Sequence, residues 1–284
     1  MKKNLLIVVI LAVCSIEMVK GQTVADSLAI VSACWKIENP QKGIVYKYAS
    51  IPQLYQGPQS ISLIEIDPVA GLKVGVAVSD KMKETSKIAS ECNAIAAING
   101  SYFDMKRGNS VCFLKADRQV IDTTMQSEFK LRVTGAINVR KGKIKLIPWS
   151  KQIEKEYKGE TGIVLASGPL MLKDGQICDW NSCGTNFIRT KHPRSAVATT
   201  KEGKILLITV DGRFPEQAEG VNIPELAHLI RILGGEDALN LDGGGSTTLW
   251  LSGASDDGVV NYPCDNGRFD HAGERKVPNI LYIH

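Results

Sequence analysis

Apolar residues along this chain fall into short runs bounded by polar residues, glycine or proline. The runs over 61–66 and 72–78 carry many β-branched residues, which favours strands. The run over 94–98 is apolar throughout, the pattern of a central buried strand. Short helices are expected over 27–37 and 83–92, so the chain reads as strand-rich with few helices.

Three pairs of expected strands are joined by short turns that end in glycine. The pairs are 136–139 with 143–147, 169–172 with 176–177, and 195–199 with 205–210. The turn glycines, Gly142, Gly175 and Gly203, supply the positive φ that a tight turn needs. The pattern therefore predicts three β-hairpins, and a last strand is expected over 277–283.

The clearest helical pattern follows Asn222, a good N-cap residue. Its apolar stripe consists of Leu226, Leu229, Ile230 and Leu233. This helix lies between expected strands over 206–210 and 238–241, which is the order of a β-α-β crossover, so these strands should run parallel. Their ends would then bring Asp211 and Asp242 to one edge of the sheet.

Together these elements predict an α+β fold, a single domain with a large mixed β-sheet flanked by a few helices. We expect residues 22–90 to form a strand-rich N-terminal portion of the same domain and residues 91–284 its core. The chain has 284 residues, of which 44% are hydrophobic, enough for a sizeable core.

The N-terminus resembles an export signal. Lys2 and Lys3 precede an apolar run over 5–13, too short to span a bilayer but suited to a signal peptide over 1–21. The alternative is a lipoprotein signal with a lipid anchor at Cys14. We therefore expect an exported protein, periplasmic or extracellular, with no transmembrane segment after the signal.

Cysteine usage and charge narrow the function classes. Cleavage after residue 21 would leave six cysteines, Cys34, Cys92, Cys112, Cys178, Cys183 and Cys264. Export permits disulfides, and Cys178–Cys183 is the first candidate, with buried free thiols as the alternative.

The net charge of +4 comes from scattered basic residues, which does not indicate nucleic acid as a partner.

Four polar clusters lie at the ends of expected strands, over 99–104, 191–195, 211–213 and 242–246. Strand ends are rigid, and the loops that leave them often carry function. The last cluster contains three consecutive glycines, whose N–H groups can form an anion-binding nest. Hydroxyls follow the glycines at Ser246, Thr247 and Thr248.

These residue types together suit the recognition of an anionic ester or a glycoside. Arg194 and Arg213 can bind phosphate in bidentate fashion, and Asp211 and Asp242 can act as general acid, general base or ligands of a divalent cation. Each motif alone also fits an ordinary role, because Asp-Gly and Asn-Gly are common turns and a glycine run can be a bulge. The glycine run is neither a P-loop nor a dinucleotide fingerprint.

Taken together, the motifs resemble the phosphodiester glycosidase family. They are Asn99-Gly100-Ser101-Tyr102-Phe103, Pro193-Arg194-Ser195-Ala196, Thr209-Val210-Asp211-Gly212-Arg213 and Asn240-Leu241-Asp242-Gly243-Gly244-Gly245-Ser246-Thr247-Thr248. The resemblance covers roughly residues 90 to 284. Ser101 departs from the family, in which many members have a second glycine at this position.

The resemblance implies hydrolysis of a sugar-1-phosphodiester, such as a GlcNAc-1-phosphodiester, to a free sugar and a phosphomonoester. It implies catalytic roles for Arg194, Asp211 and Asp242. The implied substrate-binding residues are Asn99, Tyr102, Arg213, Gly243, Gly244, Gly245, Ser246 and Thr247. A divalent cation stays an open alternative, as do a non-catalytic binder of anionic glycans and a hydrolase of another envelope phosphodiester.

Overall fold

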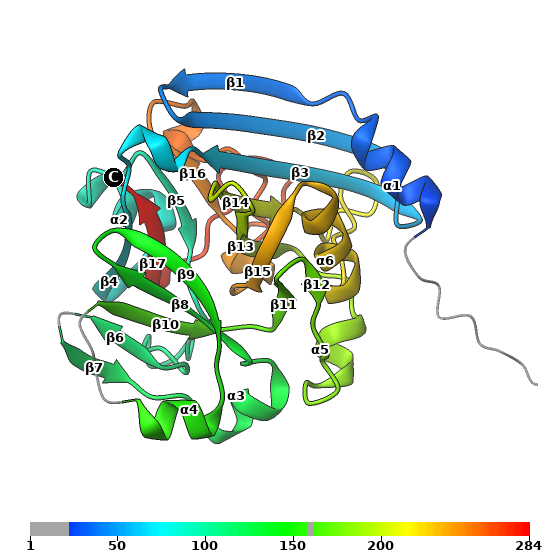
Figure 1. The fold of residues 1–284 in the computed structure, drawn as a ribbon. Helices are drawn as coiled ribbons and strands as arrows, with labels where there is room; N and C mark the ends of the chain where they lie inside the picture. The colour runs from blue at the N-terminus through cyan, green and yellow to red at the C-terminus, as the bar shows by residue number, and fades with distance from the viewer. Residues whose placement is uncertain (1–22, 117, 158–161) are drawn as a thin grey trace, which may run out of the picture.

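The computed structural model describes residues 23–284 except 117 and 158–161. The expected signal peptide over 1–21 and the lipidation candidate Cys14 lie outside this range. Within it, the chain forms three β-sheets that are flanked by a few short helices (Figure 1). No helix of the described part is long and apolar enough to cross a membrane.

The largest sheet has eight strands in the order β1-β2-β3-β14-β13-β15-β11-β12. Their bounds are β1 Lys36–Gln41, β2 Ile44–Leu54, β3 Gly57–Ile66, β14 Ile205–Val210, β13 Arg194–Thr200, β15 Gly235–Asn240, β11 Leu170–Lys173 and β12 Gln176–Ile177. All its ladders between described strands are antiparallel. Because β3 pairs with β14, the N-terminal strands extend the same sheet that carries the later motifs.

Two smaller sheets complete the strand framework. One has the order β7-β6-β10-β8-β9 and the other β16-β5-β17-β4. Their bounds are β7 Gln119–Asp122, β6 Leu114–Ala116, β10 Ile163–Ser167, β8 Gly135–Arg140, β9 Lys143–Pro148, β16 Leu249–Leu251, β5 Ala96–Asn99, β17 Val277–Ile283 and β4 Val74–Lys83. The described ladders of both sheets are antiparallel as well.

The α-helices are α1 Val24–Val31, α2 Thr85–Glu91, α3 Gln126–Leu131, α4 Lys151–Glu156, α5 Thr185–Arg189 and α6 Ile223–Ile232, and short 3-10 turns are η1 Pro68–Ala70, η2 Gly244–Ser246 and η3 Asp256–Gly258. The expected helix after Asn222 is α6. Asn222 accepts from the Glu225 backbone, and the Glu225 side chain accepts from the Asn222 backbone. This capping box fixes where the helix begins.

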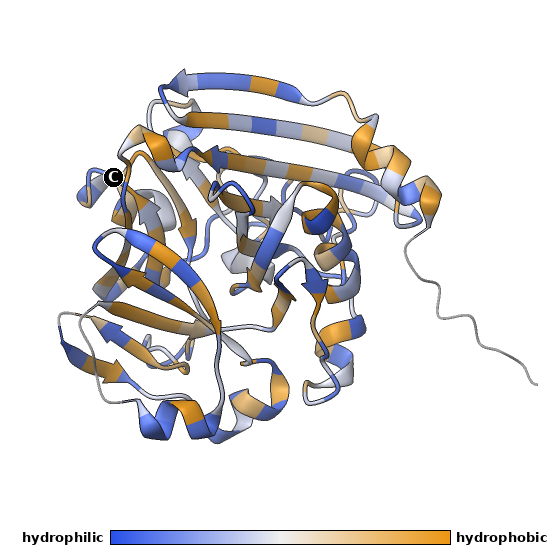
Figure 2. Ribbon diagram, viewed as in Figure 1, coloured by the Kyte–Doolittle hydropathy of each residue, from blue (hydrophilic) through white to orange (hydrophobic). Residues whose placement is uncertain are grey.

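The large sheet is buried on both faces. Along β13, Val197 packs into the core shared by the three sheets, whereas Ala196 and Ala198 pack toward α6 on the opposite face. This alternation is the period of two that a strand imposes on its side chains. The edge strand β1 is exposed along its length and largely hydrophilic (Figure 2).

The α+β class with one large sheet and few helices is confirmed, as are the three hairpins. The described ladders are antiparallel, so the sheet is not mixed in its pairing. Strands β14 and β15 do run parallel to each other, but they are not neighbours, because β13 lies between them and pairs antiparallel with both. The Cys178–Cys183 disulfide is a wrong prediction, since all six cysteines over 34–264 are free thiols.

Candidate active site

Three of the polar clusters meet at one end of the large sheet. Arg194 opens β13 opposite Val210, the last residue of β14, and the Leu241 N–H donates to the carbonyl of Ser195 at 2.8 Å. Since β13 runs opposite to both neighbours, its first residues lie beside the last residues of β14 and β15. The clusters that begin at Asp211 and Asp242 therefore leave the same edge of the sheet, as the sequence predicts.

Asn99 brings the fourth cluster to this edge. Its side-chain amide donates to the backbone carbonyl of Asp242 at 2.7 Å, and its oxygen accepts from Ser195 Oγ at 2.6 Å and the Thr248 N–H at 3.1 Å. Asn99 is fully buried. Asn99 therefore links β5, β13 and both ends of the glycine loop through one network of hydrogen bonds.

Asp242 is partly exposed at the start of the glycine loop, and its Oδ1 accepts from the Gly243 N–H at 3.0 Å. Burial raises the pKa of its carboxyl group, against the opposing effects of the Ser246 hydroxyl and the nearby Arg132 and Arg275. A carboxyl group with a raised pKa can hold or release a proton closer to neutrality than an ordinary aspartate.

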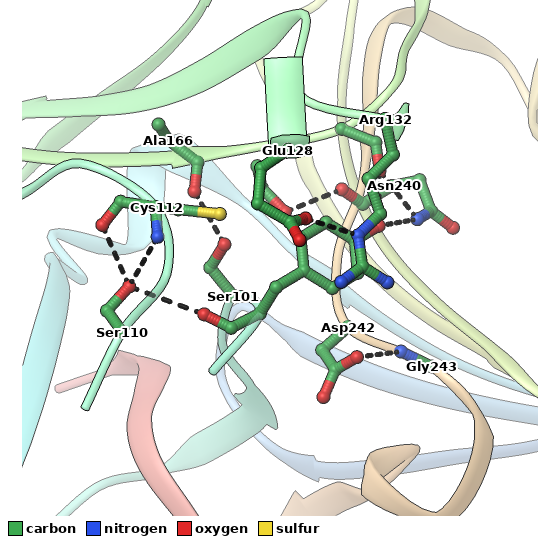
Figure 3. Close-up of polar contacts among 12 residues, drawn as sticks. Ser101, Ser110, Cys112, Glu128, Arg132, Ala166, Asn240, Asp242 and Gly243 are labelled. Carbon is green, nitrogen blue, oxygen red and sulfur yellow. Dashed lines mark hydrogen bonds and ion pairs between the residues drawn. The ribbon is translucent and has the colours of Figure 1, made fainter. Parts of the chain in front are cut away.

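Arg132, at the end of α3, points toward Asp242 and has Glu128 on its other side (Figure 3). Its Nε donates to Glu128 Oε2 at 2.7 Å, and its guanidinium carbon lies 3.6 Å from the centroid of the Tyr102 ring. Burial alone would lower its pKa, but Tyr102, Glu128 and Asp242 together raise it. Arg132 is therefore a cation that is fixed in place beside the carboxyl group of Asp242.

Most of the backbone N–H groups of the glycine loop already have hydrogen-bond acceptors within the protein. The Gly243 N–H donates to Asp242 and the Gly244 N–H donates to the Pro193 carbonyl at 2.9 Å, so two of the three expected nest donors are occupied. Within the described chain, the Gly245 N–H has no partner. This leaves one loop N–H for a bound anion.

The absence of side chains in this loop makes room for two arginines. A Cβ at Gly244, which has φ +61°, would lie 3.0 Å from Nη2 of Arg213. A Cβ at Gly245 would lie 2.3 Å from Oδ1 of Asp265 and 2.4 Å from Nη2 of Arg275, and these two side chains form an ion pair. The glycines thus let the backbone pack against guanidinium groups.

Two threonines follow the glycines of the loop. The Oγ1 atoms of Thr247 and Thr248 are buried and have no hydrogen-bond partner in the described part of the chain. Buried hydroxyl groups are usually paired, so these two are exceptions in the interior next to the glycine loop.

Asp211 differs from Asp242 because it is fully buried and fully engaged. Its Oδ2 accepts from Ser60 Oγ at 2.7 Å, and its Oδ1 accepts from Asn261 Nδ2 at 2.9 Å and the Tyr262 N–H at 3.0 Å. Burial raises its pKa to about 6, although these three donors lower it. Asn261 also donates to the Thr247 carbonyl at 3.1 Å, so Asp211 acts on the loop through Asn261.

Arg194 is also buried, with 2% exposure. Its guanidinium donates to the carbonyls of Val221 at 3.1 Å, Phe187 at 3.0 Å and Thr190 at 2.9 Å. Burial lowers its pKa to about 10. Most of its donors are thus committed to backbone around α5 and α6.

The remaining predicted residues divide between interior and rim. Tyr102 is buried, and its hydroxyl donates to the Gly168 carbonyl and accepts from Asn240 Nδ2 at 2.8 Å. Arg213 is exposed, has φ +70°, and contacts the Cys264 sulfur at 3.7 Å through Nη1.

In the described chain no group of three or more His, Cys, Asp or Glu side chains converges as a metal site, and the divalent cation stays a prediction.

Sequence reasoning missed Arg132, Glu128, Arg275 and Asn261. Arg132 follows Glu128 by four residues, and this spacing pairs side chains along a helix. This spacing in the sequence could have predicted that Glu128 and Arg132 pair. Its place beside Asp242 depends on tertiary packing and has no local motif.

Comparison with known proteins agrees with the motifs. A family model described as phosphodiester glycosidase matches residues 92–284. The mouse N-acetylglucosamine-1-phosphodiester alpha-N-acetylglucosaminidase is 24% identical over 205 residues, which cover 66% of this chain and 37% of the mouse protein. The human protein of the same name is 23% identical over 218 residues, covering 72% of this chain and 39% of its own length. The chain thus spans about two-fifths of these relatives.

Solved structures share the fold. The zebrafish N-acetylglucosamine-1-phosphodiester alpha-N-acetylglucosaminidase catalytic domain, auto-inhibited by its pro-peptide, superposes with a TM-score of 0.65 at 20% identity and covers 87% of this chain and 85% of its own. A Burkholderia pseudomallei putative exported protein gives 0.56 at 14% identity, covering 82% and 75%. With the family model matching more than half of its residues and the motifs gathered at one sheet edge, this chain belongs to the phosphodiester glycosidase family.

Proposed function

We propose that this protein hydrolyses a sugar-1-phosphodiester, for example a GlcNAc-1-phosphodiester, to a free sugar and a phosphomonoester. The observation that carries the proposal is the fixed Arg132 cation beside the partly exposed Asp242, whose pKa is raised. A phosphodiester needs a cation for its negative charge and an acid or base for its reaction with water. Membership of the phosphodiester glycosidase family supports this substrate class.

The proposed substrate-binding groups surround Asp242. Arg132, the rim residue Arg213 and the Gly245 N–H bind the phosphodiester anion, with the Ser246 and Thr247 hydroxyls close by. These donors are held before substrate arrives, so they stabilise charge in the transition state without reorganising. In the reaction, water adds its hydroxyl to one side of the broken ester bond and its proton to the other.

Asp242 is the proposed acid or base. As a neutral carboxyl it donates a proton to the leaving oxygen, and as a carboxylate it accepts a proton from the attacking water. Asp211, Arg194, Asn99 and Tyr102 act as positioning residues in this proposal, because their polar atoms are engaged inside the protein. This revises the catalytic roles that the family resemblance implies for Asp211 and Arg194.

The test is the release of free GlcNAc from a synthetic GlcNAc-1-phosphodiester by the purified chain. Asp242→Asn should abolish release, whereas Asp80→Asn, on the exposed part of β4, should not change it. Hydrolysis in oxygen-18 water then identifies the broken bond, since label in the sugar means attack at carbon and label in the phosphate means attack at phosphorus. Binding without turnover by the unmodified chain would indicate a glycan-binding protein instead.

We also propose that residues 1–21 direct export and that the substrate is a bacterial envelope or dietary sugar phosphodiester. The apolar run over 5–13 behind two lysines supports export. Fractionation of cells that make the full chain, with mass measurement of its mature N-terminus, tests this proposal. A lipid at Cys14 would support anchoring, and an intact N-terminus in the cytoplasm would contradict export.

A further inference from the structure

A second charged site lies at the far end of the large sheet from Asp242. A groove of about 710 Å³ lies between the start of β4, the β8–β9 hairpin and the β13–β14 turn. It is lined by five lysines from three segments of the chain: Lys73, Lys141, Lys143, Lys145 and Lys173. Strand β13 begins at the candidate active site and ends at this groove, about 20 Å away at the usual rise per residue.

The positive charge of the groove is largely uncompensated. Lys173 pairs with Asp237 at 2.9 Å, and Asp237 is the one acidic residue among the described residues that line the groove. The side-chain ammonium groups of the other four lysines make no hydrogen bond or ion pair within the described part of the chain. Lys143 and Lys145 are two residues apart in β9 and therefore share one face of the strand.

The groove between these lysines is aliphatic and hydroxylated. Leu72, Ile144 and Ile147, which are partly exposed, contribute apolar surface, and Thr199 and Thr200 contribute hydroxyls. Among the residues that the structure describes, no aromatic side chain and no arginine line it. The lining thus offers point charges for the anionic groups of a ligand, hydroxyls for hydrogen bonds, and apolar surface for the parts of a ligand that consist of C–H groups.

We infer that this groove binds a linear anionic glycan at a site separate from the proposed catalytic centre. Its lysines would contact charged substituents, its threonines and Asp237 the sugar hydroxyls, and its aliphatic residues the apolar faces of the sugar rings. Single-stranded nucleic acid fits less well, because bases bind by stacking on aromatic side chains and are read by arginine. A flat membrane surface fits less well, because the charge lines a hollow.

The inference is tested with heparin as the probe and the full chain as the protein. Lys141→Glu, Lys143→Glu and Lys145→Glu are combined in one variant, and affinity is measured by calorimetry at low and at physiological salt. The matched control combines Lys81→Glu, Lys151→Glu and Lys155→Glu, which are exposed lysines away from the groove with the same change in charge. We expect the groove variant to bind heparin at least about tenfold more weakly and the control to change little.

Equal loss in both variants would overturn the inference, because binding would then follow net charge alone. Unchanged binding in the groove variant would also overturn it, as would binding to vesicles with anionic lipid but not to heparin. Acetylation footprinting of the unmodified chain avoids any effect of substitution on folding. Heparin should protect Lys73, Lys141, Lys143 and Lys145 from acetylation but not Lys151, and equal protection would contradict the site.

Discussion

The guanidinium carbon of Arg132 lies 3.6 Å from the ring centroid of Tyr102, and the ring is itself held by hydrogen bonds at its hydroxyl. A cation over an aromatic face gains about 0.5–2 kcal/mol, depending on how far it is desolvated. Glu128 fixes the other side of the guanidinium. Two interactions thus orient one arginine, which explains how a residue on a short helix end can be held in position beside Asp242.

Arg132→Lys should lower kcat/KM for a GlcNAc-1-phosphodiester by about a hundredfold, the usual loss when one oriented donor to a developing charge is removed. Lysine keeps the charge but lacks the planar, forked donor group that lies over Tyr102 and pairs with Glu128. Steady-state kinetics measure the loss. Arg107→Lys is the control, because its side chain is 81% exposed, and it should leave kcat/KM unchanged. Activity of Arg132→Lys close to that of the unmodified chain would contradict the role of Arg132.

Asn99→Ala should destabilise the fold by about 2–4 kcal/mol, because it leaves the buried Ser195 hydroxyl and Thr248 N–H without their acceptor. Urea unfolding monitored by circular dichroism measures the change. Asn266→Ala, on an exposed loop, is the matched control and should cost much less. If both variants unfold at the same urea concentration, the hydrogen bonds of the Asn99 side chain contribute no stability.

Asp211→Asn should remove a pH dependence of stability while keeping the local hydrogen bonds. Burial raises the pKa of Asp211 to about 6, so its contribution to stability is fully present below the unfolded pKa near 4 and is lost as pH rises through 6. An amide oxygen can still accept from Asn261 and the Tyr262 N–H, and the amide nitrogen can donate to the Ser60 hydroxyl.

Unfolding free energies of the unmodified chain and of Asp211→Asn should therefore converge at pH 4 and separate between pH 4 and 7, with the variant more stable at the upper end. The separation is on the order of 3 kcal/mol at most. Asp211→Asn should also keep activity within about tenfold if Asp211 only positions Asn261. Complete loss of activity with an intact fold would return Asp211 to a catalytic role.

The sequence predicts those parts of this fold that are set by local chemistry. Glycine turns define the three hairpins, and the capping box of Asn222 and Glu225 defines the start of α6. The shared edge of Asp211 and Asp242 also follows from the order of strands and helix along the chain. Each of these features depends on residues that are close in sequence or on a simple rule of connection.

Long-range pairing and tertiary contact account for what could not be predicted. The β13–β14 hairpin follows from its turn, but nothing local shows that β15 pairs antiparallel with the other edge of β13. The spacing of Glu128 and Arg132 predicts that the two side chains pair, but no local motif places Arg132 beside Asp242. Arg194 sits in a recognisable motif, but its bonds to three backbone carbonyls are visible only in the folded chain.

Arg132→Gln should shift the pH dependence of kcat/KM toward higher pH. The positive charge of Arg132 opposes the effect of burial on Asp242, so its removal raises the Asp242 pKa further. The limb of the kcat/KM profile that follows the titration of Asp242 should move to higher pH by about one unit, whether Asp242 acts as acid or as base. A merely structural role for Arg132 would lower the rate at every pH without moving the limb. Arg107→Gln should show the profile of the unmodified chain, and an unmoved limb in Arg132→Gln would mean that the two charges do not interact in the working enzyme.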